Sequence, residues 1–142
     1  MLCAVTMLQA EEYLLDLPLT RSVMHLEKGV LKKDSSKPDY VGGALAPTKI
    51  RIYKEHGTYF HEMEYEDKQI IKKELLLLHD RPEQISFYWP GDPAPRLIVL
   101  SKLSMSIVIT TVASFDKERN GGDGINNFTE LLTQYGSYRN KN

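Results

Sequence analysis

The fold is decided by residues 49–115, which read KIRIYKEHGTYFHEMEYEDKQIIKKELLLLHDRPEQISFYWPGDPAPRLIVLSKLSMSIVITTVASF. Apolar and polar side chains alternate along most of this stretch, with the period of two that a half-buried strand requires. Turn signals such as His56-Gly57 and Pro90-Gly91 divide it into five or six short strands. Consecutive strands joined by tight turns predict a mainly β protein, an antiparallel meander that forms a small barrel or half-barrel.

One segment of this stretch fits two structures. Leu75-Leu76-Leu77-Leu78 is apolar on both faces, which is typical of a strand buried on both sides and equally of a helix. We predict a strand, because the neighbouring segments are strands and Arg81-Pro82 closes the run.

Each end of the chain predicts a short helix. Thr6 to Leu17 contains residues of good helical propensity and stops before Pro18. Near the C-terminus an N-cap, a capping-box glutamate, two buried leucines and a terminating glycine follow one another: Asn127, Glu130, Leu131, Leu132 and Gly136.

The remaining segments predict connections. Residues 21–33 favour a strand or hairpin interrupted at Gly29, and residues 34–47 favour a long loop. Residues 116–124 form a glycine-rich connector, and residues 137–142 a frayed polar tail. The length of 142 residues favours one domain, 1–142, in which residues 1–20 are the N-terminal helical segment.

Composition excludes several classes of protein. The net charge is −1 without a long block of one sign, which argues against a dedicated nucleic-acid binder. A single cysteine, Cys3, excludes an internal disulfide. No apolar stretch reaches the roughly 18 residues of a membrane span. We expect a cytoplasmic protein, or an exported or lipid-anchored one if the N-terminus is incomplete.

The polar residues form no familiar catalytic or metal-binding motif. The four histidines lie outside the spacings that hold a metal ion, and there is no nucleophile elbow and no phosphate-binding loop. The sequence therefore predicts no cofactor and no metal, and it makes an enzyme the less favoured interpretation.

One strand carries a face of mixed polarity. Tyr59, His61, Met63 and Tyr65 alternate with outward residues, and Trp89 stands at the end of a later strand. Such a face is typical of a ligand cavity. The alternative is that these side chains fill the core and their hydroxyls reach its rim. We predict these five residues as the ligand-binding site.

The order of strands followed by a helix, over about residues 21–132, resembles the layout of calycin or lipocalin-like barrels. The Gly-x-Trp signature of those barrels is absent: Gly29 is followed by Val30 and Leu31, and the one tryptophan is Trp89. The resemblance therefore concerns layout and assigns no residue.

Two functions fit the sequence. The first is a non-enzymatic protein that holds a small apolar or amphipathic ligand inside a β-barrel. The alternative is a protein–protein interaction module that uses a sheet edge or the loop of residues 34–47. The oligomeric state stays open. An interior filled by side chains would favour the second function.

Overall fold

The computed structural model describes residues 11–33, 37–38, 46–91, 94–115 and 128–141. These residues form eleven strands and no helix. In chain order the strands are β1 (Glu12–Leu15), β2 (Thr20–Glu27), β3 (Val30–Lys33), β4 (Lys37–Pro38), β5 (Pro47–Glu55), β6 (Thr58–Tyr65), β7 (Ile70–Asp80), β8 (Gln84–Trp89), β9 (Arg96–Ser101), β10 (Ser106–Phe115) and β11 (Phe128–Asn140).

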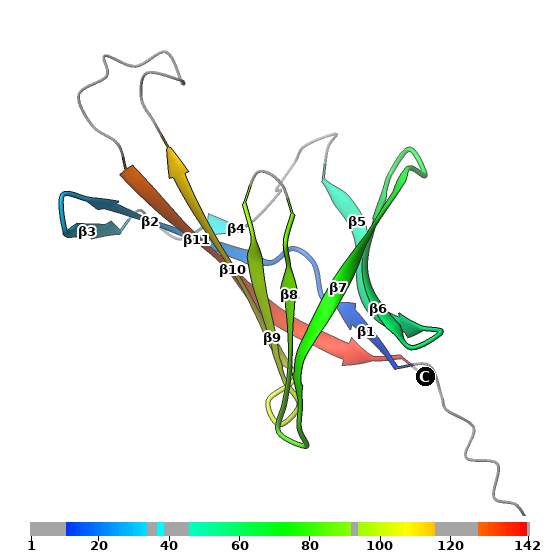
Figure 1. Ribbon diagram of the computed structural model, residues 1–142. Coiled ribbons are helices and arrows are strands. Elements are labelled where there is room, and N and C mark those ends of the chain that lie inside the picture. Colours follow the sequence, from blue (N-terminus) through cyan, green and yellow to red (C-terminus); the bar gives the residue numbers. More distant parts are fainter. Residues whose placement is uncertain (1–10, 34–36, 39–45, 92–93, 116–127, 142) are drawn as a thin grey trace, which may run out of the picture.

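Eight strands close into an antiparallel barrel (Figure 1). The order around the barrel is β1-β5-β6-β7-β8-β9-β10-β11, and β11 returns to β1. The closing strand is short: Tyr13 pairs with Ile52 of β5 on one side and with Asn140 of β11 on the other. The predicted meander is confirmed as a closed barrel. The likeness to lipocalins remains a resemblance of layout.

Part of the sheet leaves the barrel. β11 is long enough to pair along one edge with β1, through residues 138–140, and with β2, through residues 129–135. β2 then pairs with β3 and β4. Figure 1 shows the β2–β3 hairpin projecting away from the barrel. We call β2, β3 and β4 the extension.

Side chains fill the part of the barrel interior that is lined by β8, β9 and β10. Inward residues of neighbouring strands lie opposite one another, as in the row Ile85, Leu100 and Ile107, and all three are fully buried. Opposite residues of an antiparallel pair share a face, so such rows build a continuous core. The largest fully buried side chains are Tyr138, Phe87, Ile52, Ile85, Ile98, Leu100 and Ile107.

Both predicted helices are wrong where the structure describes them. Residues 12–15 form β1, in which Tyr13 and Leu15 alternate into the core, and residues 6–10 lie outside the described residues. Residues 128–140 form a single strand that pairs on both edges, with β10 and with β1 and β2. The helical propensity of these segments is overridden by burial of every second side chain.

The predicted tail also differs. Residues 137–140 belong to β11, and Tyr138 is buried and donates a hydrogen bond to the Ser101 carbonyl at 2.9 Å. The predicted connector 116–124 lies outside the described residues, as does most of the predicted loop 34–47. Within that loop, residues 37–38 form β4, and Pro47 begins β5.

The leucine run is a strand, as predicted, but it is not buried on both faces. Leu75 lies in the core, whereas Leu76, Leu77 and Leu78 are each about half exposed. A β-bulge between Leu77 and His79 interrupts the pairing with β8 at this point.

Candidate ligand site inside the barrel

The predicted site residues divide between two parts of the barrel. Tyr59 belongs to the packed core: its ring lies 4.8 Å from that of Phe87, and its hydroxyl donates to the Glu11 carboxylate at 2.5 Å. His61 and Trp89 come together further along, with nearly parallel rings 6.0 Å apart. Met63 and Trp89 pack against the core, and the Tyr65 hydroxyl approaches the Met63 sulfur at 3.8 Å.

Tyrosines close one end of the barrel. Glu11 accepts hydrogen bonds from Tyr59 and, at 3.3 Å, from Tyr13, whose ring meets Tyr138 edge to face at 5.5 Å. Burial, and after it the neighbouring Glu11, raises the pKa of both Tyr13 and Tyr59 well above the usual range. We call this region the tyrosine end.

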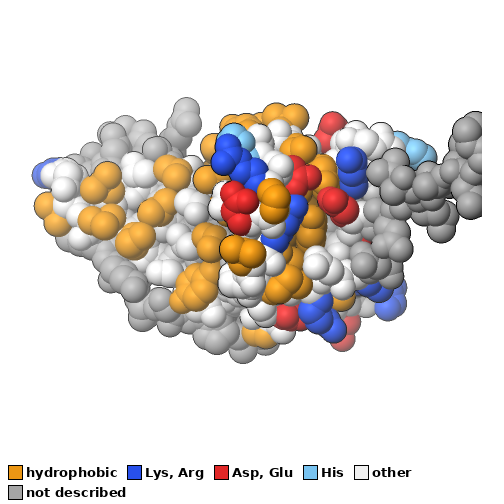
Figure 2. All heavy atoms as spheres, turned by 90° about the horizontal axis from the view of Figure 1, so that it is seen from below, with side chains coloured by type: hydrophobic (Ala, Val, Ile, Leu, Met, Phe, Trp, Pro, Cys, Tyr) orange, Lys and Arg blue, Asp and Glu red, His pale blue; other side chains and the backbone are white. Residues whose placement is uncertain are grey.

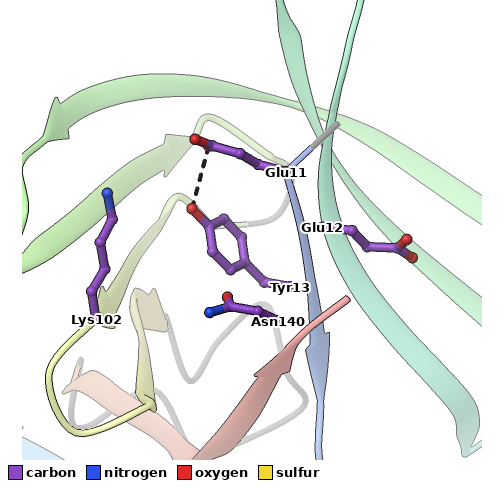
Figure 3. Close-up of a pocket in the computed structure, with 5 residues that line it drawn as sticks. All are labelled: Glu11, Glu12, Tyr13, Lys102 and Asn140. Carbon is purple, nitrogen blue, oxygen red and sulfur yellow. Dashed lines mark hydrogen bonds between the residues drawn. The ribbon is translucent and has the colours of Figure 1, made fainter. Parts of the chain in front are cut away.

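A cavity of about 220 Å³ opens beside the tyrosine end (Figure 3). In Figure 3 the Tyr13 hydroxyl points at Glu11, while Glu12 points away from both. The charges around this cavity are already matched within the protein: Lys102 contacts Asp80 at 2.6 Å, and Glu12 contacts Arg51 at 3.1 Å. Because its charged groups have protein partners, this cavity makes a weak ligand site.

A second group of polar side chains faces the interior beyond the core. Arg96 lies over the Trp89 ring, with its guanidinium carbon 4.2 Å from the ring centroid. Thr111 of β10 is the cross-strand partner of Arg96. Gln134 of β11 and Arg21 of β2 are cross-strand partners. They lie on the same inner face as Thr111, in the row next to it. We call the inner cluster the set Arg21, His61, Trp89, Arg96, Thr111 and Gln134.

Three buried polar atoms of the inner cluster have no hydrogen-bond partner among the described residues: Arg21 Nε, His61 Nδ1 and Thr111 Oγ1. Buried polar atoms are almost always hydrogen-bonded in native proteins. Leaving one unpaired costs about 1–3 kcal/mol. These three atoms on the inner face of the sheet therefore retain hydrogen-bonding capacity that the described residues do not use.

His61 is held in its neutral form. It is 3% exposed. Burial, and after it the positive charge of Arg96, lowers the pKa of His61 to about 4. A neutral imidazole carries one donor and one acceptor nitrogen, so Nδ1 can pair with either kind of group.

Backbone geometry fixes Trp89 within this cluster. A Cβ atom added at Gly91 would lie 2.5 Å from the indole Cε2. Only glycine lets the chain run this close to the ring. The turn after β8 therefore packs directly on the tryptophan and limits its movement.

The sequence identified both the imidazole and the aromatic group of this cluster, His61 and Trp89, but missed its cations. Arg96 faces the same way as Ile98 and Leu100, two and four residues further along β9. A charged residue in this inward row could have been recognised from the sequence as a site candidate. Arg21 and Gln134 carried no such signal, because their facing depends on the pairing of β2 with β11.

Comparison of the chain with family models, curated proteins and solved structures gave no match. The described residues contain no group of three or more side chains placed to hold a metal ion. Within the same residues there is no helix long and apolar enough to cross a membrane.

Proposed function

We propose that this protein binds a small amphipathic molecule at the inner cluster, without catalysing a reaction on it. The observation that carries the proposal is the trio of buried atoms on Arg21, His61 and Thr111 that no described residue pairs. A bound molecule that reaches these atoms removes the cost of leaving them unpaired.

The surroundings of the cluster suit the apolar part of such a molecule. Met63 and Trp89 are partly buried against the core and flank His61, and Leu132 is the cross-strand partner of Thr111. Ligand sites commonly combine apolar walls with a few converging polar groups. The filled interior toward the tyrosine end restricts the ligand to a small one.

Fluorescence of Trp89, the one tryptophan of the chain, tests the proposal. Titration with the neutral dye N-phenyl-1-naphthylamine should quench Trp89 saturably with one site per chain. Met63→Ala should weaken binding several-fold. Met105→Ala is the matched control, because Met105 packs against the same core but adjoins Tyr138 at the tyrosine end. Absence of saturable binding by this dye and by its sulfonated analogue would refute the proposal.

A second candidate function rests on the outer face of the sheet. Several large apolar side chains there are 39–60% exposed, namely Leu26, Leu31, Leu97, Val108, Val112 and Tyr135. Their cross-strand partners place them on one face, opposite to the inner cluster. Figure 2 shows hydrophobic side chains at the surface around the end that carries β2 and β3.

Between β9 and β2 this face is uncharged over most of its area, and Arg139 is the charged residue near the end of its β11 row. Its uncharged positions, read from the strand registers, are Leu97, Val99, Val108, Thr110, Val112, Thr129, Leu131, Thr133, Tyr135, Ser22, Met24 and Leu26. A largely uncharged face can pack on its own copy, because symmetry then brings few like charges together. We therefore propose a second copy of this chain as the partner that fits.

Light scattering after gel filtration tests this second candidate. The expected mass is that of two chains, and Val112→Lys should reduce it to one. Leu103→Lys is the control, since Leu103 is 81% exposed in the turn after β9 and lies off this face. A monomer throughout a concentration series would count against the dimer.

A further inference from the structure

Two arginines outside the barrel interior, Arg51 and Arg139, are matched by carboxylates. Arg51 contacts Glu12 at 3.1 Å and Glu62 at 3.0 Å, and Arg139 contacts Asp16 at 3.0 Å. A guanidinium is always charged in proteins and presents a fork of donors that fits an oxyanion. For Arg51 and Arg139 the protein itself supplies that oxyanion.

Arg21 differs from these arginines. It faces inward from β2, its Nε is buried, and it forms no ion pair with a carboxylate of the described residues. Its cross-strand neighbour on β11 is the uncharged Gln134. Glu130 stands further along the inner face of β11, where it contacts His25 at 3.4 Å. The residue as a whole is half-buried, and its buried Nε is left without an acceptor among the described residues.

The rest of the inner cluster adds positive charge and donors. Arg96 raises the positive potential enough to contribute to the lowered pKa of His61. The Thr111 hydroxyl and the neutral His61 ring can each donate a hydrogen bond. An acceptor-only group with negative charge, such as a carboxylate, is the kind of partner that these donors lack.

We infer that the molecule bound at the inner cluster carries an anionic oxygen group, a carboxylate or its sulfonate equivalent, that pairs with Arg21 on the inner face of β2. This inference rests on the proposed ligand-binding function and adds the chemical class of the ligand's polar end. The apolar end of the ligand lies against Met63 and Trp89.

Two dyes that differ only by an anionic group test for an anionic ligand separately from ligand binding itself. 1-Anilinonaphthalene-8-sulfonate is N-phenyl-1-naphthylamine with a sulfonate added. The wild-type protein should bind the sulfonate at least about tenfold more tightly, a difference of about 1.4 kcal/mol. Decanoate should displace the sulfonate dye, and decanol should not.

Variants of Arg21 test whether this residue causes the preference for the sulfonate. Arg21→Met keeps the apolar stem and should lower affinity for the sulfonate about tenfold while leaving affinity for the neutral dye within about twofold. Arg139→Met, which alters an exposed arginine, is the control and should change neither affinity. If Arg21→Met does not fold, Arg21→Lys retains a charge without the fork and should show a smaller loss for the sulfonate alone.

The outcomes are distinct. Equal affinity for the two dyes, with no effect of either Arg21 variant, would overturn the anionic inference and leave ligand binding standing. Failure of both dyes to bind would remove the proposed function together with the inference. Displacement by decanol as readily as by decanoate would also overturn the anionic class.

Discussion

His61 stays neutral in the folded protein at pH values where the unfolded chain protonates it. Its pKa falls from 6.5 to about 4 on burial beside Arg96. The unfolded chain therefore binds more protons between these values, and the free energy of unfolding rises with pH across that window. The shift corresponds to about 3 kcal/mol, fully lost by pH 4 and fully regained above pH 6.5.

Urea unfolding at a series of pH values from 4 to 7 measures this dependence. His61→Gln removes the titrating group, so its unfolding free energy should change by about 3 kcal/mol less than that of the wild type over the same range. His79→Gln, which replaces a histidine at an exposed position of β7, is the matched control for the substitution itself. Identical slopes for wild type and His61→Gln would show that His61 titrates normally.

Tyr59 holds Glu11 to the tyrosine end through its hydroxyl. Tyr59→Phe keeps the ring packing on Phe87 and removes the hydrogen bond to a charged acceptor. The expected loss of stability is about 1–2 kcal/mol. Tyr65→Phe, which removes only a long contact to the Met63 sulfur, should cost less than about 0.5 kcal/mol. Chemical denaturation of both variants checks the difference, and equal losses would contradict the role of Glu11.

Hairpin turns are set by residue pairs with positive φ. His56 and Gly57 have φ of +51° and +83°, and Lys28 and Gly29 have +49° and +78°. Positive φ at both central residues is the type I′ geometry that suits the twist of a two-residue hairpin. The turn at His56-Gly57, visible in the sequence, is thus the device that pairs β5 with β6.

Substitutions in that turn should have opposite signs. Gly57→Ala places a side chain at +83°, where glycine alone is relaxed, and should lower stability by about 1 kcal/mol. His56→Asn puts the favoured residue at the first position and should raise stability by a few tenths of a kcal/mol. Melting temperatures of the two variants should move in opposite directions from the wild type. A shift of both in one direction would exclude the turn as the cause.

The strands of residues 49–115 were predictable because each is bounded by its own turn signal and most of them show their own alternation; the leucine run of β7 was assigned from its neighbours. β11 was not, because Asn127, Glu130 and the two leucines form a local helix signal. The competing period-two pattern, Leu132, Gln134, Gly136 and Tyr138 facing inward, decides the structure through contacts with β10 and β2. A segment with local helical propensity forms a strand where pairing with two neighbouring strands buries every second residue.

The candidate site was predictable only in part for the same reason. The alternation of β6 placed His61 and Met63 on one face, and a strand end placed Trp89 near them. Nothing local shows that Arg21 and Thr111 face the same interior, since that relation passes through the register of β2, β11 and β10. Long-range packing also makes Tyr59 a core residue that anchors Glu11, where the alternation alone predicted a cavity residue.

The whole molecule divides into a barrel that holds the core and an extension whose far hairpin is solvated. The hydrophobic core cluster draws its strand members from the barrel, with Leu19 joining from the connection before β2. In the extension Val30 and Leu31 are more than half exposed, and β3 pairs on one edge with β2 alone among the described strands. The free energy needed to open a segment locally increases with the number of buried apolar contacts that the segment makes.

Native-state hydrogen exchange should therefore separate the two parts. Amides of β3 and of the β3-paired half of β2, residues 24–27, should exchange through local opening at a small fraction of the global free energy. Amides of β8 and β9, whose inward residues Ile85, Phe87 and Leu100 are fully buried, should exchange only on global unfolding.

Leu31→Ala should leave the unfolding midpoint almost unchanged, whereas Leu100→Ala should cost about 2–5 kcal/mol. If protection in β3 equals that in β9, and Leu31→Ala is as harmful as Leu100→Ala, then the extension is an integral part of one cooperative unit. A rise in β3 protection with protein concentration would instead identify the outer face as covered by a second chain.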